Sequence, residues 1–149
     1  MISKLLTIRP IAAGEEAAVI ALWHACDLTR PWNDPAADLA FARGKPNADV
    51  FVGLIEGQIA ASVMVGHDGH RGIMYYLAAD PSEHGKGYGR QIVAAAEAWL
   101  QARGVWKINL LVRRGNERVL GFYDAQGYTV ATSLVLEKWI DPSRRGDRR

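Results

Sequence analysis

Apolar residues recur with a period of two or of about 3.6 along most of the chain, and this pattern predicts its elements. Leu6 and Ile8 alternate with polar residues, so residues 4–9 predict a first strand, which Pro10 ends. Residues 15–27 carry apolar side chains at helical spacing and predict a first amphipathic helix. A loop with two prolines follows at residues 28–35. Because Asp34 suits an N-cap and Pro35 a first helical position, a second helix is predicted from there to Arg43.

The middle of the chain reads as three strands. Residues 49–56 and 58–66 alternate around a turn at Glu56-Gly57, and Asp68-Gly69 marks a hairpin into the next strand. Residues 73–79 form a nearly unbroken apolar and aromatic run, which predicts a strand buried on both faces.

The last third alternates helices with strands. Apolar residues recur at helical spacing from Ile92 to Leu100, and Gly104 predicts the end of that helix. Residues 107–112 predict a strand, residues 116–126 a helix, and residues 128–139 the last strand material. The order β-α-α-β-β-β-α-β-α-β(-β) predicts an α/β (α+β) fold, a mixed sheet with helices on both faces.

Composition changes this picture little. The chain has 149 residues, and we expect one domain at residues 1–140 and a flexible arginine-rich tail at 141–149. The tail holds four arginines against two aspartates, so it carries the whole formal net charge of +2. A neutral body argues against a nucleic-acid-binding surface, although the tail itself remains open as a nucleic-acid or partner arm.

Other patterns bear on location and redox state. No apolar run approaches the roughly 20 residues of a membrane span, and Arg9 interrupts the only N-terminal apolar run, so we expect a cytoplasmic protein that does not enter a membrane. Cys26 is the only cysteine, which excludes an internal disulfide. It is expected to be a small core residue, with a catalytic thiol as the alternative.

Three alternating glycines, Gly85, Gly87 and Gly89, stand between the third predicted strand of the middle region and the next helix. Glycine lets the backbone approach a ligand closely, and first-turn N–H groups attract anions, so the loop predicts a phosphate site. Lys86 and Arg90 add positive charge. The alternative is a tight turn without a ligand. The spacing matches neither a P-loop nor a dinucleotide fingerprint.

The string His84-Gly85-Lys86-Gly87-Tyr88-Gly89, after Ala79-Asp80-Pro81, resembles the acetyl-CoA loop of the GNAT acetyltransferase superfamily. His84 departs from it, since that family has Arg or Gln there. The resemblance covers roughly residues 5–139 and implies acetyl-CoA as cosubstrate on a mostly antiparallel sheet. It implies that pyrophosphate binds the N–H groups of residues 85–90. It also implies that free backbone groups of Leu77 and Ala79 pair with pantetheine and polarise the thioester. The implied cofactor residues are Leu77, Ala79, Gly85, Lys86, Gly87, Tyr88, Gly89, Arg90 and Asn116.

A second block, residues 116–128, resembles the family's Asn-x-x-Ala-x-x-x-Tyr-x-x-x-Gly-Phe/Tyr, with Val119 in place of Ala. The resemblance implies that Asn116 hydrogen-bonds the pantetheine arm and that Tyr123 is the catalytic acid for the CoA thiolate. A phenol of pKa about 10 holds its proton at neutral pH, which suits that role. The alternatives are a helix N-cap for Asn116 and a core side chain for Tyr123.

Two further strings, residues 26–35 and 68–77, resemble the small bacterial YpeA-type acetyltransferases within that superfamily. They fall where an acceptor pocket is implied, and the substrate-side residues are Arg30, Trp32, Asn33, Asp34, His70, Arg71 and Tyr76. Either Arg30 or Arg71 would suit a carboxylate on the acceptor, or both are tied up in loop hydrogen bonds. Trp32 either covers the core or forms a wall of the pocket. The general base stays open among His70, Asp68, Asp34, Tyr76 and a water relay.

The sequence thus predicts an acyl-CoA-dependent N-acyltransferase that moves an acetyl group to a primary amine of a small molecule or peptide. The alternatives are a non-catalytic acyl-CoA-binding module and a nucleotide-binding domain. His67 and His70 are too sparse a set for a metal site, so no metal is expected. A homodimer through late strands is one option. Leu134, Leu136 and Trp139 would serve it or belong to the core.

Overall fold

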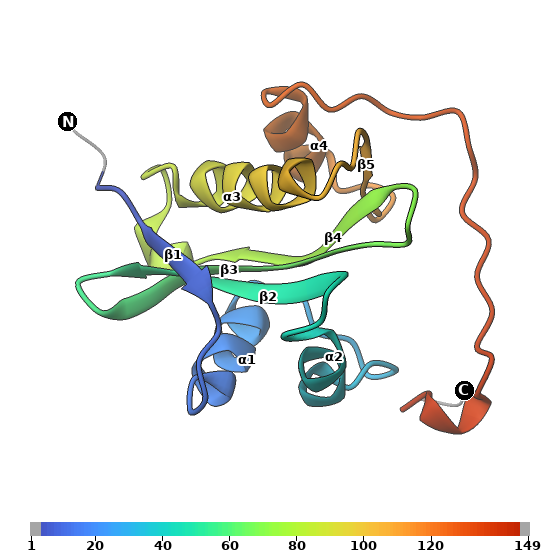
Figure 1. The fold of residues 1–149 in the computed structure, drawn as a ribbon, viewed down its shortest axis with the longest axis horizontal. Coiled ribbons are helices and arrows are strands. Elements are labelled where there is room, and N and C mark those ends of the chain that lie inside the picture. Colours follow the sequence, from blue (N-terminus) through green and yellow to red (C-terminus); the bar gives the residue numbers. More distant parts are fainter. Residues whose placement is uncertain (1–3, 147–149) are drawn as a thin grey trace.

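The computed structural model describes residues 4–146, so the last three residues of the predicted tail lie outside it. Its elements, in chain order, are β1 (Thr7–Pro10), α1 (Glu16–Ala25), α2 (Pro35–Ala42), β2 (Ala48–Ile55), β3 (Gln58–His67), β4 (Gly72–Ala79), η1 (Pro81–Glu83), α3 (Tyr88–Ala102), β5 (Ile108–Asn109), α4 (Glu117–Asp124) and η2 (Pro142–Arg144). The sheet has the order β1-β2-β3-β4-β5, antiparallel from β1 to β4 and parallel between β4 and β5. Helices α1 and α2 cover one face, and α3 and α4 the other (Figure 1). The predicted mixed sheet with helices on both faces is therefore confirmed.

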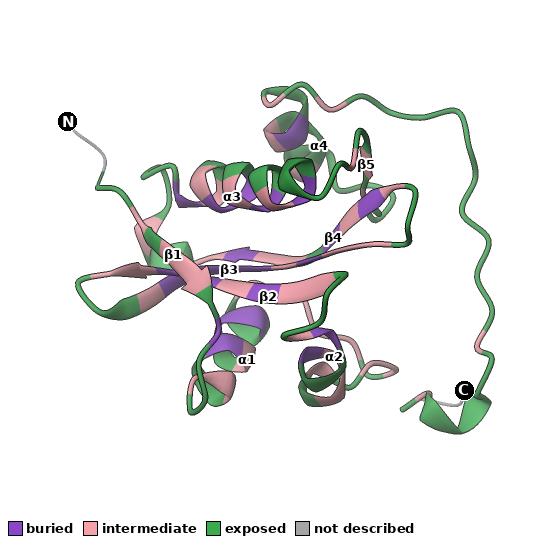
Figure 2. Ribbon diagram, viewed as in Figure 1, coloured by how far each residue is buried: buried purple, intermediate pink, exposed green. Residues whose placement is uncertain are grey.

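The sheet separates two hydrophobic cores. The inward face of α3 meets one side of β3 around Val63, Val65 and Ile92, all fully buried. On the other side, Trp23 of α1 packs against β3 and β4, and Leu39 of α2 belongs to the same cluster, next to β2. The indole nitrogen of Trp23 donates to Ser62 Oγ at 2.8 Å, which satisfies the one polar side chain buried in β3. Buried positions accordingly line both sides of the central strands (Figure 2).

Helix α2 begins as the sequence predicts. The side chain of Asp34 accepts a hydrogen bond from the N–H of Ala37 at 3.0 Å, and Pro35 occupies the first turn. At α4, Asn116 Oδ1 accepts from the N–H of Val119 at 3.3 Å. Both helices therefore start at a side chain that satisfies a backbone donor with no partner inside the helix.

Strand β4 is not buried on both faces, contrary to the prediction. Its register with β3 shifts: Met64 pairs with Tyr75 and Ser62 with Ala78, so two residues of β4 stand opposite Val63. Tyr76 lies in this bulge with a φ of +51°, and Tyr75 just before it is 43% exposed. An apolar run predicts burial only on average, and it does not locate a bulge.

The two late strands are the larger corrections. Strand β5 contains only Ile108 and Asn109, where residues 107–112 were predicted. Within the described residues, no strand follows α4, although residues 128–139 were expected to form one. The segment runs from the α4 side of the sheet to the α2 side without joining it (Figure 1). Leu134 and Leu136 are 81% and 92% exposed, so the core role is wrong for these two residues. Alternating apolar residues favour a strand, but a strand also needs a neighbouring strand with which its backbone can form hydrogen bonds.

The start of the arginine-rich tail lies against the first half of the chain. The N–H of Gly146 donates to the carbonyl oxygen of Trp32 at 3.2 Å. The turn η2 thereby comes beside the loop that precedes α2. Within residues 4–146, no helix is both long enough and apolar enough to cross a bilayer.

Candidate active site

The parallel strands β4 and β5 pair only at their beginnings. Gly72 pairs with Ile108 and Ile73 with Asn109, and the N–H of Gly72 donates to the carbonyl of Lys107 at 2.8 Å. Beyond these pairs β5 ends, while β4 continues to Ala79. The second half of β4 therefore keeps a free edge inside the molecule, and this edge is one wall of the candidate site.

Backbone groups at the end of β4 face this free edge. The N–H of Asp80 donates to Ala60 of β3 at 2.8 Å, and successive residues of a strand point to alternate sides. The backbone groups of Ala79 and Leu77 therefore point away from β3. The carbonyl oxygen of Ala79 accepts from the thiol of Cys26 at 3.2 Å. The two predicted pantetheine-binding positions thus both lie at the open edge, with one carbonyl already engaged.

The glycine loop leads from β4 to the N-terminus of α3. Gly85 and Gly87 have φ of +84° and +79°, and a Cβ built on either one would meet no atom within 4 Å. No side chain caps the helix, and the first helical bond runs from the N–H of Gln91 to Gly87 at 3.1 Å. The N–H groups of residues 88–90 therefore have no partner inside the helix, whereas the N–H of Lys86 donates to the carbonyl oxygen of Glu83 at 3.4 Å. Such a helix start favours an anion.

The third glycine has a packing role instead. A Cβ on Gly89 would lie 3.1 Å from the ring of Phe122, so this glycine lets α3 approach α4. The side chain of Tyr88 is buried in the core, which leaves only its backbone N–H for a ligand. Lys86 forms an ion pair with Glu83 and stays half-exposed, while Arg90 is exposed at the first turn of α3.

Tyr123 of α4 is buried, with 9% of its surface exposed. Its ring contacts Phe122 and Tyr128 edge-on, at centroid distances of 5.1 and 5.2 Å. Burial raises the pKa of Tyr123 to about 12, so the phenol keeps its proton at neutral pH. Asn116 begins the same helix and is exposed; its Oδ1 caps α4, and its amide N–H₂ can still donate. The N-cap role and the implied cofactor role of Asn116 are therefore compatible.

A cavity of about 270 Å³ opens on the other face of the sheet, where the loop before α2 meets the tail. Its lining comprises Trp32, Asn33, Asp34, Ala37, Asp38, Trp139, Ser143 and Arg144. Three predicted substrate-side residues, Trp32, Asn33 and Asp34, thus share one cavity. The Arg113 guanidinium lies 5.8 Å from the centre of the Trp32 ring, so residues from both ends of the chain surround this indole.

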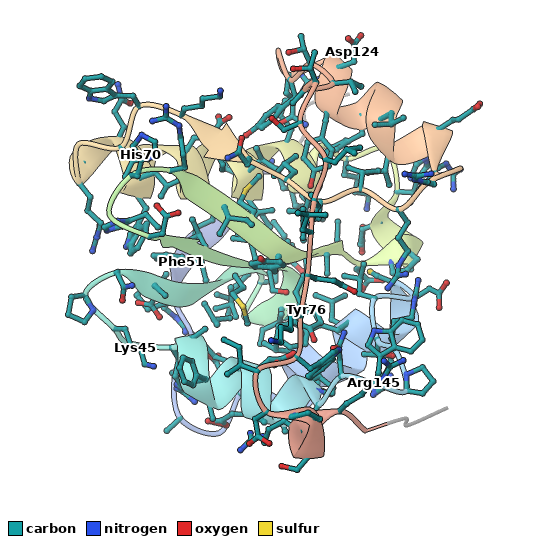
Figure 3. The ribbon with its side chains drawn as sticks, turned by 90° about the vertical axis from the view of Figure 1, so that its right-hand side faces the viewer. Lys45, Phe51, His70, Tyr76, Asp124 and Arg145 are labelled. Atoms are coloured by element: carbon teal, nitrogen blue, oxygen red, sulfur yellow. The ribbon has the colours of Figure 1, made fainter. Side chains whose placement is uncertain are left out.

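The other predicted substrate residues are distributed differently. One Arg30 nitrogen donates to the carbonyls of Asp27 and Thr29 at 2.9 and 2.8 Å, which ties this side chain to its own loop. His70 and Arg71 belong to the hairpin between β3 and β4, where Asp68 Oδ1 accepts from both their backbone N–H groups at 2.8 Å. Arg71 lines a different cavity, together with residues of β3 and β4. Figure 3 shows His70 well apart from Tyr76.

Tyr76 links β4 to α2, beside the cavity described above. It stands at the bulge of β4, and its hydroxyl donates to Asp38 Oδ2 of α2 at 2.6 Å. Its ring stacks on Trp23 with 3.9 Å between centroids and 10° between planes. Burial, reinforced by Asp38, raises the pKa of Tyr76 above its usual range. The sequence prediction did not include Asp38, although its position one turn after Asp34 places both carboxylates on the same side of the helix.

The structure also bears on the alternatives of a catalytic thiol and a metal site. Cys26 is half-buried, and burial raises the pKa of its thiol, so a thiolate is disfavoured at neutral pH. In the described part of the chain, no three His, Cys, Asp or Glu side chains come close enough together to hold a metal ion.

Comparisons with known proteins agree with this geometry. The sequence profile of the acetyltransferase (GNAT) family matches residues 17–128. An acetyltransferase of Pectobacterium atrosepticum is 40% identical over 140 residues, which are 93% of this chain and 99% of that relative. The chain therefore belongs to the acetyltransferase (GNAT) family, and acetyl-CoA-dependent N-acetyl transfer is its activity.

Solved structures share the fold at low sequence identity. AAC(6')-Iy in complex with the bisubstrate analogue CoA-S-monomethyl-acetylneamine has a TM-score of 0.76 at 14% identity, over 91% of this chain and 99% of that one. Glucosamine-6-phosphate N-acetyltransferase of Arabidopsis thaliana has a TM-score of 0.69 at 21% identity, over 93% of this chain and 100% of that one. These likenesses confirm the predicted fold class.

Proposed function

We propose that this chain transfers the acetyl group of acetyl-CoA directly to a primary amine of a small molecule or peptide. One observation carries the proposal: the free edge of β4 leads to a helix start that no side chain caps, so its first N–H groups have no partner inside the helix. That combination suits an extended thioester arm that ends in phosphates.

The cofactor residues divide by the part of acetyl-CoA that they would hold. The N–H groups of residues 85–90 would bind the pyrophosphate, except that of Lys86, which donates to the carbonyl oxygen of Glu83. The side chains of Lys86 and Arg90 would add positive charge at the surface. The outward backbone groups of Leu77 and Ala79 would pair with the pantetheine arm. The free amide of Asn116 would donate to the same arm. An N–H of β4 near the bulge would polarise the thioester carbonyl.

Starting from the neutral amine, the reaction needs one bond exchange and two proton movements; an acceptor that binds as an ammonium ion must first release one proton to solvent. The amine nitrogen attacks the thioester carbon, a C–N bond forms, and the C–S bond breaks. Nitrogen loses one proton on the acceptor side, and the departing thiolate takes the proton of Tyr123. Holding both reactants in one site supplies much of the rate enhancement. After turnover, Tyr123 recovers a proton from solvent.

The acceptor would enter from the face that carries α1 and α2. The cavity beside Trp32 and Asp34 offers an aromatic wall and carboxylate charge, which suit a cationic amine. Arg30 is a poor carboxylate ligand, because one of its nitrogens is held by loop carbonyls. Of the candidate bases, His70 and Asp68 lie at the hairpin, whereas Asp34 and Tyr76 lie on the acceptor side. Tyr76 holds its proton too firmly to act as a phenolate.

An acetylation screen tests this proposal. The purified chain would be incubated with acetyl-CoA and one of four amines: neamine, glucosamine 6-phosphate, spermine or a peptide with a free N-terminal alanine. Release of free thiol and the mass of the product would be measured together. We expect a product 42 Da heavier than one of the amines, formed in step with CoA.

The alternatives predict different results. Tight binding of acetyl-CoA without transfer to any amine would indicate a non-catalytic acyl-CoA-binding module. Binding of ATP or NAD in place of CoA would indicate a nucleotide-binding domain, and it would contradict the reading of the glycine loop.

A further inference from the structure

A stacking contact and hydrogen bonds fix the side chains of Asp38 and Tyr76. The Tyr76 ring lies flat on the fully buried indole of Trp23, and that indole is itself fixed by its bond to Ser62. Asp38 projects from α2 into the cavity beside Trp32. The short 2.6 Å bond between the tyrosine hydroxyl and the carboxylate is typical of a charge-assisted hydrogen bond. The hydroxyl of Tyr76 therefore has one preferred orientation.

The backbone at Tyr76 is unusual in the same place. A φ of +51° is uncommon and strained for a residue with a bulky side chain. The bulge turns the side chain of Tyr76 toward Asp38 and Trp23, while Leu77 keeps its backbone at the open edge of β4. Tyr76, which carries the phenol oxygen, therefore directly precedes Leu77, whose backbone groups are proposed to bind the thioester, on the acceptor side of β4.

A phenol has a single proton to donate. Once that proton is committed to Asp38, the oxygen can only accept hydrogen bonds from other groups. The nearby negative charge also makes the oxygen a stronger acceptor. The free sites on this oxygen thus suit an N–H donor and disfavour a carbonyl or carboxylate.

We propose that Asp38 is a positioning residue for the acceptor amine: it fixes the Tyr76 hydroxyl so that its oxygen accepts an N–H of the attacking nitrogen. This inference rests on the proposed function. The hydrogen bond to Tyr76 would orient the nitrogen with its lone pair toward the thioester carbon. Asp34 does not share the role, because its Oδ1 caps α2. Arg144 lines the same cavity.

The test is a mutant cycle on acetyl transfer to the best amine of the panel above. Tyr76→Phe removes the hydroxyl and keeps the ring on Trp23. Asp38→Ala frees the hydroxyl to rotate, and Asp38→Asn keeps an oxygen that can accept its proton. Because the two residues act as a unit, each of the first two variants should lower kcat/KM about tenfold, and the double variant Asp38→Ala/Tyr76→Phe should lose no more than either one. Asp38→Asn should recover at least half of the loss on a logarithmic scale.

A matched control exists on the opposite face. The Tyr128 hydroxyl donates to Glu97 Oε2 at 2.6 Å, the same bond outside the proposed acceptor side. Glu97→Ala breaks that bond from an exposed position of α3, leaves the Tyr128 ring beside Tyr123 and should leave kcat/KM unchanged within about threefold. Binding of acetyl-CoA, followed by calorimetry, should be the same in all variants.

The outcomes separate the two proposals. Additive losses in the cycle, no loss in Tyr76→Phe, or no recovery in Asp38→Asn would overturn the role of the pair while acetyl transfer by the wild-type chain stands. If the wild-type chain acetylates none of the amines, both the proposed function and this inference fail. Should Asp38→Ala not fold, the comparison of Tyr76→Phe with Glu97→Ala decides the question.

Discussion

Tyr123 combines a polar hydroxyl with an apolar setting, and its proposed role depends on both. Its ring is enclosed by Phe122 and Tyr128, and burial holds its pKa near 12. A phenol with that pKa remains protonated across the whole physiological range. A thiolate that leaves beside it would therefore meet a protonated phenol, and the raised pKa also makes that phenol a weaker acid than an exposed one.

Removal of this hydroxyl gives the first prediction. Tyr123→Phe should lower kcat by about 10²-fold or more, the range expected for loss of a general acid. Acetyl-CoA affinity should stay within about threefold, because the ring and its contacts remain. Stopped-flow detection of free thiol and calorimetry measure the two quantities separately. An unchanged kcat would remove Tyr123 from the mechanism.

A second prediction concerns acid stability. Both oxygens of Glu15 accept from the Arg9 guanidinium at 2.8 Å, which joins β1 to the start of α1. This contact, with a bond from the N–H of Ala12, lowers the pKa of Glu15 from 4.5 to about 2. A lowered pKa contributes stability above pH 4.5 that is lost as the pH falls toward 2.

Glu15→Gln should therefore cost stability at pH 7, and the difference from the wild-type chain should shrink between pH 4.5 and 2. Urea unfolding at several pH values measures this. Glu56→Gln is the control, because Glu56 pairs with Lys4 at an exposed site and should have little effect. A difference that is constant with pH would contradict the account.

At the scale of elements, close approach of α3 to the sheet depends on Gly72. A Cβ at this position would lie 2.6 and 2.9 Å from the two terminal carbons of Leu100, which is itself buried. Gly72 also donates the hydrogen bond that joins β4 to β5. The place where the two strands begin to part is thus fixed by one small residue under α3.

Gly72→Ala should lower the free energy of unfolding by about 1–3 kcal/mol, as expected for overpacking in a core. Gly121→Ala is the matched control. Gly121 lies inside α4, with no atom within 4 Å of its built Cβ, so alanine should stabilise the chain by about 0.5–1 kcal/mol. Chemical denaturation measures both. Equal effects of the two substitutions would show that Leu100 makes room at no cost.

Sequence reasoning located elements best where a local signal fixes the backbone. Asp34-Pro35 and Asn116 placed helix starts, and the positive φ of Gly57 and Gly69 agrees with the predicted hairpin turns. The bulge at Tyr76 was missed, because it depends on pairing with β3 rather than on local residues. For the same reason, Asp38 was not linked to Tyr76, 38 positions away in the chain. The prediction that His70 shares a pocket with Trp32 came from resemblance alone.

At the scale of the whole molecule, the segment between α4 and η2 stands out. Val130, Leu134, Leu136 and Ile140 lie close together in the chain and are all more than 80% exposed. Exposed apolar side chains that gather in this way mark an interaction surface. We expect a second copy of the chain to cover them and to form the homodimer that the sequence leaves as one option.

Sedimentation velocity tests this expectation. The wild-type chain should sediment as a dimer at micromolar concentration, and Leu136→Asp should shift it toward monomer, since a charge in an apolar interface lacks a partner. Leu5→Asp, at another exposed leucine, should leave the dimer intact. A monomeric wild-type chain would contradict the expected homodimer and would leave the proposed chemistry unaffected.

The central claim is that acetyl-CoA binds at the glycine loop and the free edge of β4. Thermal unfolding of the purified chain with acetyl-CoA, CoA, ATP or NAD tests it most directly. A ligand at 100 times its Kd adds roughly 2.7 kcal/mol to the free energy of unfolding, which visibly raises Tm. We predict stabilisation by acetyl-CoA and CoA, and loss of that shift in Gly87→Val, which places a branched side chain at a φ of +79°. No shift with either thioester or thiol, or a shift with ATP or NAD alone, would contradict the account.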